Sequence, residues 1–78
     1  MKNNKINTQY PRIEELRKQN NQKQSDIADK LEMHLTQYRR YEKAETPVTA
    51  DFILKIALLY NVSADYILGL TEEQKKYW

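Results

Sequence analysis

Apolar residues recur along this sequence three or four positions apart, the period of one face of an α-helix. Ile13 and Leu16 lie three apart among charged residues, and Ile27, Ala28 and Leu31 repeat the pattern further on. The polar stretch NNQ separates these two groups. The full pattern predicts five short helices, over residues 11–20, 24–31, 35–43, 49–61 and 64–68.

Several residues mark where these helices begin and end. Pro11 suits the first turn of a helix, where its missing N–H is not needed. Ser63 is a good N-cap, and Val62 before it with Ile67 after it has the arrangement of a hydrophobic staple. Gly69 supplies the left-handed residue that closes the last helix. Strand signals are absent, so we predict an all-α fold, a compact five-helix bundle.

Length and composition exclude several classes of protein. The chain has 78 residues and no cysteine, which fits one domain without disulfides, thiolate zinc sites or thiol nucleophiles. The single glycine argues against a phosphate-binding loop. No apolar run approaches the roughly 20 residues of a membrane span, and the start lacks a signal peptide. We therefore expect a cytoplasmic protein with no membrane association.

No constellation of acid, base and nucleophile can be assembled from this sequence. Ser25 and Asp26 near His34 suggest a catalytic triad, but a small helical bundle offers no evident pocket for one. One histidine without cysteines does not make a plausible zinc site. We expect no enzymatic activity, no metal, no cofactor and no small-molecule ligand.

Charge is distributed unevenly along the chain. The formal net charge of +2 divides into +4 through Lys43 and −2 from Ala44 onward. The basic excess therefore lies with the N-terminal residues and the adjacent pair Arg39 and Arg40. This asymmetry is compatible with a polyanionic partner, although two arginines on an isolated helix are more often a solvated face.

The predicted helices over 24–31 and 35–43 are joined by only three or four residues. Apolar positions link them, which is the layout of a helix-turn-helix, with Met33 in the turn and Tyr38 and Tyr41 turned inward. We assign the two tyrosines to the core rather than to base stacking. Such a pair leaves the outer face of its second helix projecting, in a shape that fits the DNA major groove, which is about 12 Å wide.

At this point the sequence resembles the Cro/cI-type (XRE) helix-turn-helix regulators, which have a lambda-repressor-like DNA-binding domain. The resemblance covers residues 12–71, and its carriers are RIEELRKQN, QSDIADKLEM, YRRYEKAE and LKIALLYNVSADYILGL. It implies a DNA-binding domain over 10–70, followed by a short tail over 71–78. The polar residues 1–9, with one isolated apolar residue at Ile6, are expected to form a flexible basic arm.

The resemblance also implies roles for individual residues. Base reading falls to Leu35, Thr36, Gln37 and Arg40. Contact with the DNA backbone falls to Lys23, Gln24, His34, Arg39 and Lys43. Arg40 can fork onto guanine O6 and N7, and Leu35 and Thr36 can pack on a thymine methyl group. Glu42 is expected to support the fold by orienting or pairing with a nearby basic side chain.

Four residues depart from the family pattern. Lys23 replaces the usual Ser or Thr cap and cannot accept an N–H. Glu32 and Ala44 stand where glycine is frequent, which suggests strain or a different turn. Gln22 stands where an apolar residue is usual. These departures bear on the turn and leave the surface from Leu35 to Arg40 intact.

The helix over 49–61 is more apolar than one buried face requires. Its core stripe consists of Ile53, Ile56, Ala57 and Tyr60. Leu58 falls off that stripe, and Phe52 and Leu59 are further candidates for exposure. Ordinary scatter of surface apolar residues is one explanation. The other is a dimer contact through Leu58, together with Tyr77 and Trp78 of the tail.

The expected function is sequence-specific binding of double-stranded DNA by a transcriptional regulator, a repressor of phage, mobile-element or antitoxin type. It would act as a homodimer on a palindromic operator, with the helix over 35–43 in the major groove. The alternative is a protein-interaction module or antitoxin that uses the same fold mainly to bind a partner protein. The modest net charge and the missing turn glycines favour this alternative slightly, and the cluster of basic residues around one edge speaks against it: Lys23, Arg39, Arg40 and Lys43.

Overall fold

The computed structural model describes residues 10–74 and consists there of five helices. They are α1 (Pro11–Gln19), α2 (Gln24–Lys30), α3 (Leu35–Glu42), α4 (Ala50–Tyr60) and α5 (Ala64–Leu68). The all-α prediction is confirmed, with boundaries within one or two residues of those expected. No strand occurs among residues 10–74. No helix in this part of the chain is long and apolar enough to cross a membrane. The division into arm, domain and tail stays a prediction.

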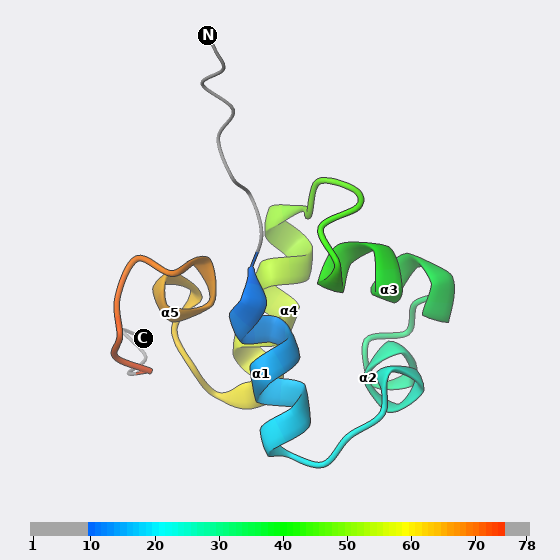
Figure 1. Ribbon diagram of the computed structural model, residues 1–78, viewed down its shortest axis with the longest axis horizontal. Coiled ribbons are helices and arrows are strands. Elements are labelled where there is room, and N and C mark those ends of the chain that lie inside the picture. The colour runs from blue at the N-terminus through cyan, green and yellow to red at the C-terminus, as the bar shows by residue number, and fades with distance from the viewer. Residues whose placement is uncertain (1–9, 75–78) are drawn as a thin grey trace, which may run out of the picture.

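The helices form two wings around a central pair. Helices α1 and α4 lie in the middle, with α2 and α3 on one side and α5 on the other (Figure 1). Ile13, Ile27, Tyr38, Ile56 and Ile67 are almost completely buried, so each helix contributes at least one residue to a single core. The apolar seam between α2 and α3 includes Ile27, Ala28, Leu31 and Tyr38. This seam fixes α3 at the edge of the bundle with one side free.

Side-chain caps close the second half of the chain. Thr49 Oγ1 accepts a hydrogen bond from the Phe52 N–H at 3.0 Å, and Ser63 Oγ accepts from the Tyr66 N–H at the same distance. Gly69 takes a left-handed conformation with φ of 82° and ends α5. Ser63 and Gly69 therefore have the roles that the sequence predicted, and Thr49 caps the helix that was predicted to begin there.

The two missing glycines do not change the turns. Glu32, after α2, has φ of 56°, and Ala44, after α3, has φ of 58°. Both residues adopt the left-handed conformation that glycine tolerates best, at a steric cost to a side chain of about 1–2 kcal/mol each. The expected alternative of a different turn is not observed.

One expectation about α4 is wrong. Phe52 is 3% exposed rather than a surface residue. Its ring lies 4.5 Å from the Tyr41 ring and 6.0 Å from the Tyr38 ring, centroid to centroid. Phe52 therefore faces α3, on a second buried side of α4 that a single stripe does not predict. Leu54, which the pattern did not single out, is 50% exposed.

Arg12 joins the first turn of α1 to the stretch that follows α5. Its guanidinium lies 4.1 Å from the Tyr66 ring centroid, and its Nη1 donates to the Tyr66 carbonyl at 2.8 Å and to the Thr71 carbonyl. Nη2 forms an ion pair with Glu72 Oε1 at 2.8 Å. Arg12 thus ties together segments that are about as far apart in sequence as the described chain allows.

Candidate nucleic-acid interface

Helix α3 turns a polar face away from the bundle. Thr36, Arg39 and Arg40 are exposed along it, and His34 and Lys43 are exposed at its two ends. Thr36, Arg40 and Lys43 follow one another at helical spacing, so they share one side of the helix. The structure therefore gathers these predicted site residues on a single projecting element.

Two of the predicted base-reading residues are less open. Leu35 is half-buried and packs against the core, and Gln37 is half-buried. Only part of the Leu35 side chain is available to a partner. Leu58 is 57% exposed but lies on α4, away from α3. Tyr77 and Trp78 lie outside the described residues.

Basic side chains divide into two groups according to their ion pairs. Within residues 10–74, every Lys or Arg outside the stretch 23–43 forms an ion pair with a carboxylate: Arg12, Arg17, Lys18 and Lys55. In the same part of the chain, no ion pair involves the basic residues of that stretch: Lys23, Lys30, Arg39, Arg40 and Lys43. The acidic residue of α3, Glu42, is turned inward. The outer face of α3 therefore carries uncompensated positive charge.

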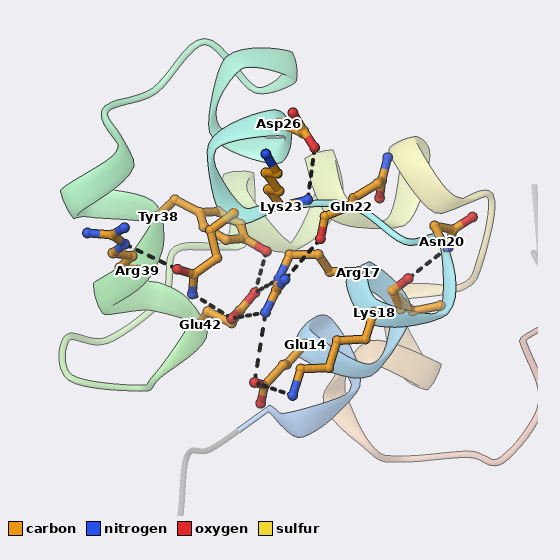
Figure 2. A network of polar contacts seen from close by, with 12 residues as sticks. Glu14, Arg17, Lys18, Asn20, Gln22, Lys23, Asp26, Tyr38, Arg39 and Glu42 are labelled. Carbon is orange, nitrogen blue, oxygen red and sulfur yellow. Dashed lines mark hydrogen bonds and ion pairs between the residues drawn. The ribbon is translucent and has the colours of Figure 1, made fainter.

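Glu42 is the centre of a buried polar network behind that face (Figure 2). Its side chain is 2% exposed and accepts hydrogen bonds from Arg17 Nε at 2.8 Å and from Arg17 Nη2 at 3.2 Å. Tyr38 Oη donates to the same carboxylate at 2.6 Å, and Gln24 Nε2 donates to it at 2.9 Å. Four donors thus surround one buried charge, which is the condition under which a buried carboxylate is tolerated.

The network shifts the pKa values of its members. Burial by itself would raise the pKa of Glu42, but hydrogen bonds from Arg17, Tyr38 and Gln24 and the charge of Arg17 outweigh it, so the pKa is lowered. The hydrogen bond to Glu42 raises the pKa of Arg17. Burial, followed by the hydrogen bond to Glu42, raises the pKa of Tyr38. Glu42 and Arg17 are therefore both charged near neutral pH. The expectation that Glu42 supports the fold by pairing with a basic residue is confirmed.

Gln24 connects this network to the surface. Its Nε2 donates to Glu42, while its Oε1 accepts from Arg39 Nε at 3.1 Å. Gln24 and Arg39 also border a surface hollow of about 420 Å³ between the start of α2 and α3. The remaining residues around the hollow are Arg17, Lys23, Ser25 and Leu35. Two of its six bordering residues, Lys23 and Arg39, are basic and form no ion pair among residues 10–74, so the hollow suits an anionic group.

The start of α2 lacks a side-chain cap on its first N–H groups, as Lys23 predicted. Half of a capping arrangement remains, because Asp26 Oδ2 accepts from the Lys23 N–H at 2.8 Å. This bond also engages the Asp26 carboxylate.

Among residues 10–74, no group of three or more His, Cys, Asp or Glu side chains could hold a metal ion.

Sequence reasoning missed the partners on α1 and α4. Gln22 Oε1 accepts a hydrogen bond from Tyr60 Oη at 2.9 Å, and the Gln22 carbonyl accepts from Arg17 Nη1 at 3.0 Å. Burial raises the pKa of Tyr60 to about 12, with Arg17 lowering it and Glu42 raising it. The unusual polar residue at Gln22 was a signal for this contact, since a half-buried amide needs partners.

The sequence profile described as helix-turn-helix matches residues 13–67, which include all five helices except the ends of α1 and α5. The chain belongs to the helix-turn-helix family. It is of the Cro/cI (XRE) type that its sequence resembles.

Two bacterial relatives support the assignment. The HTH-type transcriptional regulator ImmR of Bacillus subtilis (strain 168) is 37% identical over 65 residues, which are 83% of this chain and 51% of the relative. The uncharacterized HTH-type transcriptional regulator YobD of the same strain is 36% identical over 62 residues, 80% of this chain and 55% of the relative. This helix-turn-helix chain thus spans about half the length of these curated relatives. No solved structure matches it at comparable significance.

Proposed function

We propose that this helix-turn-helix protein is a transcriptional regulator that binds double-stranded DNA sequence-specifically, with α3 in the major groove. The observation that carries the proposal is the division of basic residues. Within residues 10–74, every Lys or Arg outside the stretch 23–43 pairs with a carboxylate, whereas Arg39, Arg40 and Lys43 on the outer side of α3 do not. Uncompensated cations on a projecting helix are the chemistry that a phosphate backbone attracts. The names of the two Bacillus relatives support the same function.

Residue roles follow from the placement of each side chain. Thr36 and Arg40, exposed on the same side of α3, read base edges, with Gln37 beside them and the exposed part of Leu35 packing on a thymine methyl group. The DNA backbone is bound by residues around the rim of this surface: Lys23, His34, Arg39 and Lys43, with Gln24 hydrogen-bonded to Arg39 among them. We assign no catalytic role to the protein.

The regulator acts as a repressor in this proposal, by occupying a palindromic operator as a homodimer. Two-fold symmetry would place two α3 helices about 34 Å apart, on successive major-groove faces. Leu58 is the described residue that we propose for the dimer contact, because a leucine that is 57% exposed gains from being covered.

A selection experiment tests this function. Wild-type protein and Arg40→Ala are each used to enrich duplexes from a random library at a low and a high salt concentration. We expect an inverted repeat for the wild type, with one position in each half relaxed by Arg40→Ala. Enrichment of no sequence at either salt concentration would refute the proposal.

One observation favours a second candidate, binding of a partner protein as in an antitoxin. Leu58 borders a hollow of about 370 Å³ between α2 and α4. The other residues around it are Lys30, Leu31, Glu32, Lys55 and Leu59. A partner covering this hollow would bind with weak salt dependence, whereas DNA binding that neutralises several phosphates weakens steeply as salt rises.

A further inference from the structure

Gln24 lies between a buried anion and an exposed cation. Its Nε2 is 2.9 Å from Glu42 Oε1, on the inner side, and its Oε1 is 3.1 Å from Arg39 Nε, on the outer side. Gln24 is half-buried and Arg39 is exposed. Both polar ends of the amide are therefore engaged by the protein itself.

The chemistry of Glu42 fixes which way the Gln24 amide points. An ionised carboxylate only accepts hydrogen bonds, so the side of the amide that faces it must be the NH₂ group. Glu42 is held in place by two bonds from Arg17 and one from Tyr38, and its pKa is lowered, so it stays ionised. The Gln24 oxygen is consequently left facing outward, where it can only accept, and the donor that it meets is Arg39.

This arrangement selects one edge of the Arg39 guanidinium. Arginine can fork an anion with Nε and one Nη, or with its two Nη groups. Because the Nε–H of Arg39 donates its hydrogen bond to Gln24 Oε1, the two Nη groups remain free to point away from the bundle. Arg39 borders the hollow at the start of α2, together with Lys23.

We infer that Gln24 is a positioning residue that aims the two Nη groups of Arg39 at a DNA phosphate beside the groove. The inference rests on the proposed function, and it replaces a direct contact of Gln24 with DNA. Holding a flexible side chain in its bound geometry removes an ordering cost from binding. For one arginine the expected gain in affinity is about three- to tenfold.

The test combines DNA affinity with its salt dependence. Gln24→Met keeps the length of the side chain and removes both hydrogen bonds, and Gln19→Met makes the same change at an exposed residue outside the site. Binding to a short duplex enriched by the wild type is measured by fluorescence anisotropy over a series of KCl concentrations. The same measurement is made for Arg39→Ala and for the double variant Gln24→Met/Arg39→Ala.

Positioning predicts that Gln24→Met weakens binding about three- to tenfold and lowers the salt slope toward that of Arg39→Ala. The double variant should bind no more weakly than Arg39→Ala, and Gln19→Met should bind as the wild type does. A neutral glutamine that touched DNA directly would change affinity but not the slope, because no counterion release depends on it. The inference would therefore be overturned if Gln24→Met weakened DNA binding equally in the wild type and in Arg39→Ala, with an unchanged salt slope.

A second measurement needs neither DNA nor a variant that folds. Hydrogen exchange of the arginine Nε–H groups is followed by NMR in the free wild-type protein. Arg39 should exchange several-fold more slowly than Arg40 of the same helix, which has no hydrogen-bond partner for its guanidinium within residues 10–74. Equal exchange of the two would show that Gln24 does not hold Arg39. Slow exchange in a protein that binds no duplex would refute the regulatory function, and the positioning role with it.

Discussion

Arg17 of α1 and Glu42 of α3 form a two-pronged ion pair across 25 positions of sequence, with N–O distances of 2.8 Å and 3.2 Å. The guanidinium side chain is 12% exposed and the carboxylate side chain 2%. The pair fixes the angle at which α3 leaves the bundle, because it joins the C-terminal turn of α3 to the centre of the fold. Stability and the proposed DNA surface therefore depend on the same contact.

Removing Arg17 should cost more stability than removing an exposed cation on the same helix. Arg17→Met leaves the Glu42 charge buried without its counterion, and we expect the free energy of unfolding to fall by about 3–5 kcal/mol. Lys18→Met breaks only an exposed pair with Glu14 and should cost less than about 1 kcal/mol. Urea unfolding followed by circular dichroism measures both. Adding Glu42→Leu to Arg17→Met should recover part of the loss, and a strictly additive double variant would contradict the pairing.

Stability should fall at both ends of the pH scale. The pKa of folded Glu42 lies below its ordinary value of 4.5, so its contribution is complete above that pH and is lost as the pH falls through the folded pKa. The pKa of Tyr60 is raised from 10.0 to about 12, so its contribution is complete below pH 10 and is lost as the pH rises toward 12. Urea midpoints across pH measure the curve. Tyr60→Phe should flatten its alkaline limb, and an unchanged limb would show that burial of Tyr60 contributes nothing there.

Glycine at the two left-handed turn residues should stabilise the protein. Glu32→Gly and Ala44→Gly relieve the positive φ, and after the entropic cost of glycine each should raise the free energy of unfolding by about 0.5–1 kcal/mol. Asp29→Gly, inside α2, is the control and should lower it by about 0.3 kcal/mol. Thermal unfolding distinguishes the signs. Destabilisation by all three glycines would mean that the turns are not strained.

Lys43 and Arg40 should affect DNA binding in different ways. Lys43→Ala should weaken binding to every sequence and lower the slope of log K against log salt by about 1, because one phosphate contact is lost. Arg40→Ala should cost about 1–3 kcal/mol on the preferred sequence and much less on others. Titrations with an enriched and a scrambled duplex compare the two variants. If both variants lost affinity equally on both duplexes, Arg40 would not be reading bases.

Leu58 should control self-association if the proposed dimer contact is right. Leu58→Asp places a charge in that interface, and we expect the free protein to shift toward monomer in analytical ultracentrifugation. Leu54→Asp is the matched comparison, because Leu54 is 50% exposed on the same helix but borders a different hollow, with Tyr10 and Leu68. Dissociation by Leu54→Asp alone would move the interface to the α4–α5 side and exclude Leu58.

Local signals carried most of the fold. The cap at Ser63, the left-handed Gly69 and the helical spacing of the core depend only on residues a few positions apart, so the sequence alone predicts them. Phe52 was placed wrongly because its burial depends on rings from α3, and periodicity within α4 contains no information about a second neighbour.

The site was predicted only in outline for the same reason. The exposed face of α3 follows from one helix and its seam. The partner of Glu42 lies 25 positions away, and the bond that engages Gln24 spans 18 positions. The hydrogen bonds of Gln24 with Glu42 and Arg39 were not predicted, because nothing nearby in sequence indicates that these two side chains engage its amide.

The contacts of Arg12 hold the two ends of the described chain together without a covalent bond. Arg12, in the first turn of α1, is hydrogen-bonded to the Thr71 carbonyl and paired with Glu72. Local unfolding of either end of the described chain therefore breaks the same set of contacts. The two ends should consequently open together, as one cooperative unit of local unfolding, rather than independently. Arg12, although distant from α5 in sequence, would then protect the backbone amides of α5 from hydrogen exchange.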